Sequence, residues 1–208
     1  MRFDRAVWSS MPGVEAAGYW MACVVDRARR FCSALDAAGV PYAVCGGLSV
    51  MAWVASRDES LARTTKDVDV LMRRKDLPRA ASALAPHGFT PTEVSGVHMF
   101  LDGPEGTPST AVHIIMAGEP TRPHDPAPVP DLGAGHRDEH APWARVEVER
   151  LLHMKLLAMR PHDIVHIADL MRVGLIDPSW RAQTPESLRD RFDRAVEQYD
   201  QHYRDSPH

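Results

Sequence analysis

Two aspartates stand inside the apolar run DVDVLM at residues 67–72, and this run constrains the fold more than any other stretch of the chain. Side chains alternate between the two faces of a strand, so Asp67, Asp69 and Leu71 would share one face. Two neighbouring carboxylates repel each other, and each is costly to bury without a partner. A divalent cation such as Mg²⁺, which prefers oxygen ligands, would remove that cost. The alternative is an edge strand whose polar face meets solvent, and the spacing alone fits both.

A second pattern precedes the aspartates. PYAVC (41–45) predicts a strand, Gly46-Gly47 a turn, and LSVMAWVA (48–55) a short apolar helix. Glycines at such a turn let backbone N–H groups approach a phosphate closely, and the N-terminus of the helix adds positive potential. Ser49 would add a hydroxyl group. The motif is not a P-loop, because no lysine follows its last glycine.

The remaining periodicities predict a mixed α/β core followed by helices. Helical spacing runs from Trp20 to Leu35, and DLPRAASALA (76–85) predicts a helix that Gly88 ends. FTPTEV, VHMFLD and TAVHIIM predict three strands. We expect an α/β (α+β) fold with a twisted mixed sheet and flanking helices. The expected parts are an N-terminal arm (1–17), an α/β core (18–116), a Pro/Gly/His-rich loop (117–145) and a C-terminal helical region (146–208).

Composition narrows the class of protein further. The chain of 208 residues carries a formal net charge of −4, so no global basic field attracts nucleic acid. Its three cysteines form no C-x-x-C pair, which favours free thiols over disulfides or a zinc site. The apolar stretch AAGYWMACVV (16–25) is far shorter than the roughly 20 residues of a membrane span. We expect a cytoplasmic protein with no membrane partner.

Taken in order, the strand–Gly-Gly–helix unit and RTTKDVD (63–69) resemble the nucleotidyltransferase superfamily, which includes DNA polymerase beta and kanamycin nucleotidyltransferase. Within it, the likeness is closest to the minimal nucleotidyltransferases and the abortive-infection toxin group, and it covers residues 40–175. The resemblance implies Mg²⁺, with Mn²⁺ as a substitute, and a nucleoside triphosphate (NTP) as substrate. The implied metal ligands are Asp67 and Asp69. The implied nucleotide-binding residues are Gly46, Gly47, Ser49, Arg63, Thr65 and Lys155. For Arg63, an ordinary surface ion pair is an equal alternative.

MKLLAMRPHDIVHIADL (154–170) carries the lysine that the resemblance assigns to the triphosphate. A lysine on an apolar helix also commonly extends to water, which is the alternative for Lys155. A local ion pair between two helices would explain Arg160 and Asp163. His162-Asp163 looks superficially like the doublet of HD-type metal phosphohydrolases. Pro161, however, makes this pair a helix start, where aspartate is favoured for capping alone.

The sequence departs from the superfamily at one position. The superfamily usually supplies a third carboxylate from a later strand, and the matching position in the apolar run AVHIIM (111–116) holds His113. A neutral imidazole can ligate a metal or accept a proton but adds no negative charge. Asp102 and Glu119 flank this run and are candidate substitutes.

Two functions from different classes follow. The first is Mg²⁺-dependent transfer of a nucleotide from an NTP to an acceptor hydroxyl, with His113 as a catalytic residue beside Asp67 and Asp69. Its acceptor would be an RNA end or a protein side chain, ahead of an aminoglycoside-type drug, in a toxin-like role with an antitoxin partner or a homodimer. The second is a non-catalytic nucleotide-binding or interaction module of the same fold, in which His113 marks lost chemistry.

Overall fold

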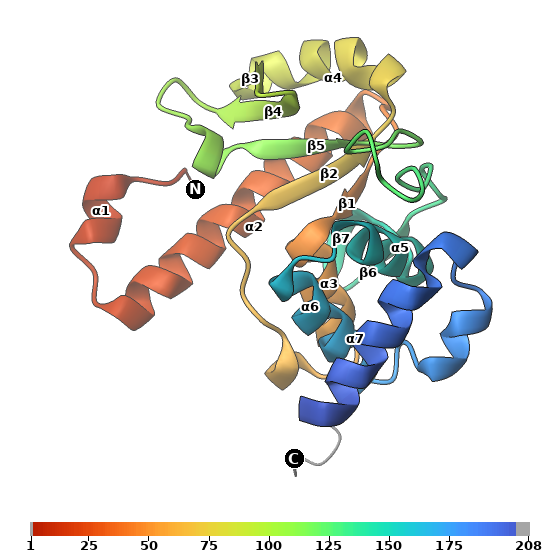
Figure 1. Cartoon of the computed structure of the whole chain (residues 1–208). Coiled ribbons are helices and arrows are strands. Elements are labelled where there is room, and N and C mark those ends of the chain that lie inside the picture. Colours follow the sequence, from red (N-terminus) through yellow and green to blue (C-terminus); the bar gives the residue numbers. More distant parts are fainter. Residues whose placement is uncertain (1, 203–208) are drawn as a thin grey trace.

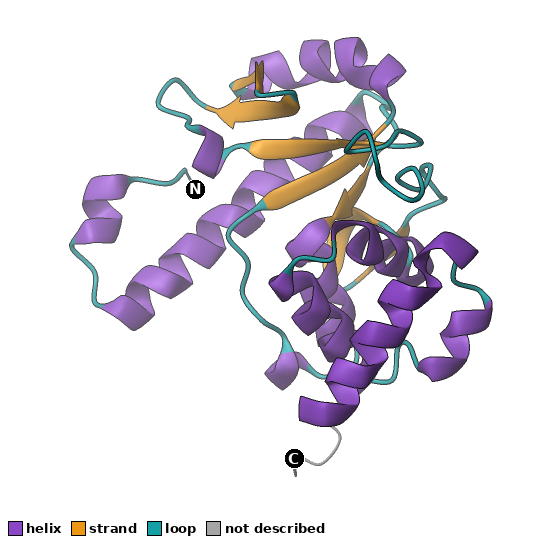
Figure 2. Cartoon of the chain, viewed as in Figure 1, coloured by secondary structure: helices purple, strands orange, loops and turns teal. Residues whose placement is uncertain are grey.

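The computed structural model describes residues 2–202, which form a mixed sheet between two layers of helices (Figures 1 and 2). The sheet has seven strands in the order β3-β4-β5-β2-β1-β7-β6. Pairs β2–β5 and β1–β7 are parallel, whereas the other neighbours are antiparallel. The predicted α/β class with a mixed sheet is therefore confirmed. The strands are β1 (Ala43–Cys45), β2 (Val68–Met72), β3 (Phe89–Val94), β4 (Val97–Asp102), β5 (Val112–Met116), β6 (His136–Asp138) and β7 (Ala141–Arg145).

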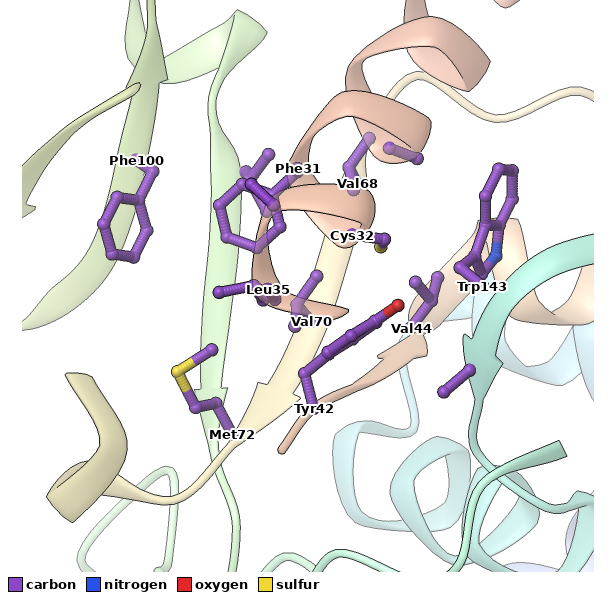
Figure 3. Packing of buried hydrophobic residues seen from close by; sticks show 14 of the residues in the cluster. Phe31, Cys32, Leu35, Tyr42, Val44, Val68, Val70, Met72, Phe100 and Trp143 are labelled. Carbon is purple, nitrogen blue, oxygen red and sulfur yellow. The ribbon is translucent and has the colours of Figure 1, made fainter. Parts of the chain in front are cut away.

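One face of the sheet is covered by α2 (Gly13–Ala37) and α4 (Leu77–Leu84). Val24, Ala28, Phe31 and Leu35 recur at helical spacing along α2, and all four are fully buried against the sheet. Figure 3 shows this packing, with the aromatic ring of Phe31 beside the strands. The ring lies 5.2 Å from that of Phe89 in an edge-to-face arrangement, which is a favoured aromatic geometry.

The other face is covered by α5 (Val148–Ala158), α6 (Pro161–Arg172) and α7 (Arg189–His202), which lie together in Figure 1. The short helix α3 (Gly46–Ala55) follows β1 directly and contributes to both cores: Leu48 and Ala52 belong to the first, whereas Val50 and Val54 belong to the second. The N-terminus of α3 is thereby fixed between the sheet and the C-terminal helices. None of the helices within residues 2–202 is both long and apolar enough to cross a membrane.

Two of the predicted segments differ from the structure. The arm at 1–17 is largely helical, because α1 (Arg5–Ser9) lies within it and α2 already begins at Gly13. Glycines at 13 and 18 weaken the sequence signal for a helix. Forming the first turn of a helix is unfavourable, but the packed half of α2 already provides that turn. The helix can therefore extend toward Gly13, because each further residue adds one backbone hydrogen bond.

The predicted loop at 117–145 contains two strands, β6 and β7. The sequence obscured β7 because Pro142 lacks a donor and Arg145 is charged. In the fold, Arg145 is fully buried, donates hydrogen bonds to Asp138 of β6 and stacks over the Trp53 ring at 4.1 Å. These partners are distant or weakly patterned in sequence, so the strand could only be found in the tertiary structure.

Candidate active site

Three neighbouring strands bring the central residues together. Asp69 on β2 is opposite Cys45 on β1 and opposite His113 on β5. His113 Nδ1 lies 3.7 Å from Asp69 Oδ1, and the two side chains are 22% and 26% exposed. The expectation that His113 lies beside the aspartate strand is confirmed. The adjacent Asp69 carboxylate raises the pKa of His113 above its usual value.

Glycine is required where α3 begins. Gly46 has φ +65°, and a Cβ atom at this position would overlap the Asp69 carboxylate. A Cβ at Gly47 would lie 2.6 Å from Thr65 Oγ1. The backbone of the first turn of α3 therefore packs directly against Asp69 and Thr65, with the positive end of the helix toward the carboxylate. Gly46, Gly47 and Thr65 thus lie together beside Asp69, and their contact with a phosphate stays a prediction.

Asp67 precedes β2 and is exposed to solvent, and its N–H lies 3.4 Å from Thr65 Oγ1. Arg63 reaches in another direction, where its Nε donates to Asp169 of α6 at 2.7 Å. The ion-pair interpretation of Arg63 is what the structure shows. This pair connects the segment before β2 to the C-terminal helices.

Lys155 lies inside the protein, so the alternative in which it extends to water is wrong. It is 4% exposed, and its Nζ donates to Asp163 Oδ1 at 2.8 Å. Arg160 Nε donates to the other oxygen of Asp163, also at 2.8 Å. Burial alone would raise the pKa of Asp163, but Arg160 and Lys155 together hold it below its usual value. Two cations share one carboxylate, which leaves a net positive charge.

This positive cluster lies near the aspartates. Desolvation tends to lower the pKa of Arg160, but Asp163 raises it above the usual value, with smaller contributions from the charges of Asp69 and Asp67. Asp163 also accepts a hydrogen bond from the Arg160 N–H at 3.1 Å, where α6 begins. The predicted capping role of Asp163 and the predicted ion pair between the two helices are both confirmed.

A cavity of about 410 Å³ opens between these groups. Gly46, Asp69, Lys155, Arg160 and Asp163 line one part of it. The segment after β5 lines another part, so the predicted loop forms a wall of the cavity. A cavity of this size is typical of a site for a small molecule.

Two residues suggested by the sequence lie elsewhere. Ser49 is fully buried inside α3 and does not line the cavity, and its Oγ has no hydrogen-bond partner among the described residues. The predicted phosphate contact of Ser49 therefore has no geometric support. Asp102 pairs instead with Arg27 and Arg30 of α2, so it does not replace the missing carboxylate.

Sequence patterns alone do not place Arg160 and Glu119 at the cavity. Glu119 lines the cavity and pairs with Arg74 at 2.8 Å, across 45 residues of sequence. No local pattern indicates such a pair. For Arg160 a signal existed, because the run Arg160-Pro161-His162-Asp163 is a helix start that places a cation beside a capping carboxylate.

The residues also fit the metal that the resemblance implies. Within residues 2–202, no three His, Cys, Asp or Glu side chains converge closely enough to hold a metal by themselves. Mg²⁺, however, is usually bound through one or two carboxylates and completed by water and substrate phosphates. The donor set of Asp67 and Asp69 therefore suits a magnesium ion that enters together with a nucleotide.

The chain is similar to known proteins in structure but not detectably in sequence. No protein-family model matches the sequence, and the search of curated proteins finds no match. A crystal structure of an antigenic nucleotidyltransferase-like protein from Paracoccidioides brasiliensis is similar with a TM-score of 0.52 and 18% identity, over 88% of this chain and 89% of that one. The solution structure of the antibiotic-resistance factor ANT(2″)-Ia is similar with a TM-score of 0.50 and 14% identity, over 84% of this chain and 94% of that one.

These similarities define the class of protein: the chain has the nucleotidyltransferase fold. The resemblance of its motifs to the nucleotidyltransferase superfamily is confirmed at the level of the fold.

Proposed function

We propose that this protein is a Mg²⁺-dependent nucleotidyltransferase that moves a nucleotide from an NTP to an acceptor hydroxyl. One observation carries the proposal: the N-terminus of α3, the Asp69 carboxylate, and the two cations Lys155 and Arg160 that share Asp163 line a single cavity. A nucleotide with its metal needs each of these groups, because its phosphates are anionic and its metal binds oxygen ligands. Mn²⁺ would serve as a substitute for Mg²⁺.

In this proposal the triphosphate lies against the first turn of α3. Backbone N–H groups at Gly46 and Gly47 donate to phosphate oxygens, and Lys155 and Arg160 offset the negative charge. Asp67 and Asp69 hold the magnesium ion. When bound, the metal would neutralise phosphate charge and favour departure of pyrophosphate.

His113 is the residue that we assign to remove the proton from the attacking hydroxyl group. Its Nε2 lies 3.1 Å from the carbonyl oxygen of Pro108, which can only accept a hydrogen bond. In the neutral ring Nε2 therefore carries the hydrogen, which leaves Nδ1, on the side of Asp69, as the acceptor. The hydroxyl oxygen of the acceptor substrate attacks the α-phosphorus, and the bond to pyrophosphate breaks. Nδ1 of His113 takes the proton of that hydroxyl group.

For the acceptor, we rank an RNA end or a protein side chain above a small-molecule drug. A toxin-like role with an antitoxin partner, or a homodimer, belongs to the same hypothesis. One structural neighbour is an antibiotic-resistance factor, so a drug acceptor is retained as an outcome of the test. The decisive experiment incubates the protein with each α-labelled NTP, Mg²⁺ and cell extract, and identifies the molecule that gains label.

The variants Asp67→Asn and Asp69→Asn test whether these two carboxylates hold the metal. Both should abolish transfer and remove the Mg²⁺-dependent thermal stabilisation by NTP, while the variants stay folded. At a hundredfold excess of ligand over Kd this stabilisation is about 2.7 kcal/mol, which a melting experiment resolves. Undiminished Mg²⁺–NTP stabilisation in both variants would contradict the metal assignment.

The second candidate is a nucleotide-binding module without turnover. It is favoured by His113, which stands opposite Asp69 where a third carboxylate is expected. This candidate predicts NTP binding with no labelled product under any condition. The same experiment therefore separates the two functions.

A further inference from the structure

The cavity extends beyond the groups that the proposed function uses. β2 and β5 run parallel, and Asp69 and His113 are the second residues of these two strands. At about 3.3 Å per residue, the three residues of β5 that follow His113 line the cavity over about 10 Å. Arg74 comes shortly after the end of β2, and Glu119 shortly after the end of β5. The cavity thus has a phosphate end at Gly46 and a distal end at Arg74 and Glu119.

Apolar side chains form much of the rest of the lining. They include Val97, Met116, Val129, Met154 and Leu157, which come from β4, β5, the segment after β5, and α5, and the same segment after β5 adds Thr121 and Arg122. A cavity with apolar walls and a few fixed polar groups is typical of sites for planar organic molecules. A nucleotide whose phosphates occupy the Gly46 end would extend its sugar and base along these walls.

The distal end holds the Glu119 carboxylate, which is paired with Arg74 at the exposed rim of the cavity. Arg74 donates to Glu119 through Nε at 3.0 Å and through Nη2 at 2.8 Å. Its third nitrogen, Nη1, lies 3.1 Å from His98 Nε2, so the guanidinium is held from both sides. The hydrogen bonds from Arg74 lower the pKa of Glu119, which keeps the side chain ionised at neutral pH. An ionised carboxylate accepts hydrogen bonds and donates none.

We propose that the distal end binds the nucleobase, and that Glu119 selects bases with an exocyclic amino group. This inference rests on the proposed function. Adenine, cytosine and guanine carry amino hydrogens that can donate to the carboxylate. Uracil has carbonyl oxygens on both sides of the single N–H of its pairing edge, and these oxygens would face the carboxylate unfavourably. Arg74 acts as a positioning residue, because it orients Glu119 through two parallel hydrogen bonds.

Calorimetric titration with Mg²⁺ and two matched nucleotide pairs tests the proposal. CTP and UTP differ at C4 by an amino group against a carbonyl, and GTP differs from ITP only by its 2-amino group. In at least one pair, the amino-bearing member should bind about tenfold more tightly, the lower end of what a hydrogen bond to a charged group supplies. Inorganic tripolyphosphate, which has no base, reports on the phosphate end alone.

Three variants locate the effect. Glu119→Gln has an amide that donates as well as accepts, so the preference should fall below about threefold. Arg74→Lys retains the charge but cannot form the two parallel bonds, and it should weaken the preference in the same direction. Glu139→Gln, at a side chain that is 89% exposed and does not line the cavity, should retain the full preference. Tripolyphosphate should bind all of these proteins equally.

The possible failures are distinct. If the wild-type protein binds neither NTP nor tripolyphosphate, the proposed function is wrong and the inference falls with it. If tripolyphosphate and all nucleotides bind without preference, only the assignment of the base is wrong. If Glu119→Gln retains the wild-type preference, another group selects the base.

Discussion

The backbone at Gly46 gives the sharpest test of the site, because its conformation and its surroundings can be perturbed separately. Gly46→Ala adds a single methyl group, which would overlap the Asp69 carboxylate. Gly39→Ala is a matched control: Gly39 has φ +61°, close to the +65° of Gly46, but nothing lies within 4 Å of its added Cβ. The two variants share the backbone strain, and only Gly46→Ala disturbs the site.

The expected magnitudes follow from these contacts. Placing alanine in the left-handed region costs about 1–2 kcal/mol in either variant. At Gly46 the displaced Asp69 adds the cost of a forced fit, about 1–3 kcal/mol. Gly46→Ala should therefore lose more unfolding free energy than Gly39→Ala. Its affinity for Mg²⁺–NTP should fall at least tenfold, because both the backbone approach and the metal ligand are altered.

Urea unfolding measures the first effect, and melting with and without Mg²⁺–NTP measures the second. At a nucleotide concentration one hundred times the wild-type Kd, a tenfold loss of affinity lowers the stabilisation from about 2.7 to about 1.4 kcal/mol. Gly39→Ala should retain the full ligand-induced stabilisation despite its lower stability. If Gly46→Ala also retains it, the nucleotide does not bind at the start of α3, and the reasoning is refuted.

Lys155→Met should destabilise the fold by about 3–5 kcal/mol, because it breaks a buried pair with Asp163, and should weaken NTP binding roughly ten- to a hundredfold. Adding Asp163→Asn should restore part of the stability but not the affinity; recovery of both would mean that the lysine is only structural. His113→Ala should slow transfer with little change in NTP binding, and His113→Asp should keep or raise activity; an alanine variant with wild-type turnover would exclude the assigned proton acceptor. Burial, with the charge of Lys155, lowers the pKa of His166 to about 4. Between pH 6.5 and 4 the imidazole therefore binds a proton more readily in the unfolded chain than in the folded one. The unfolding free energy should fall by about 3 kcal/mol as the pH drops through this range. His166→Gln should flatten that part of a stability profile measured by urea unfolding, and an unchanged slope would contradict the shift.

The central part of the site was predictable because its signals are local. The alternation in DVDVLM, the glycines after a short strand and the apolar run containing His113 each depend on residues close together in sequence. Their order then predicted neighbouring strands, and the register confirms that Asp69 stands opposite His113. Ser49 shows the limit of such reasoning. A hydroxyl near a glycine turn suggests a phosphate contact, but the helical rotation directs this side chain into the core.

The sequence by itself determined which segments are strands or helices in the α/β core, and which carboxylates gather at the end of one strand. It did so because side-chain periodicity and glycine conformation act over a few residues. Only the tertiary structure decided that Lys155 and Arg160 share Asp163, that β7 joins the sheet beside β1, and that Arg74 fixes Glu119 at the far end of the cavity. Lys155, Asp163 and Arg145 are buried charges, which are tolerable only where a partner from another element arrives at hydrogen-bonding distance. Arg74 and Glu119 are exposed, but they lie 45 residues apart, so only the fold brings them together.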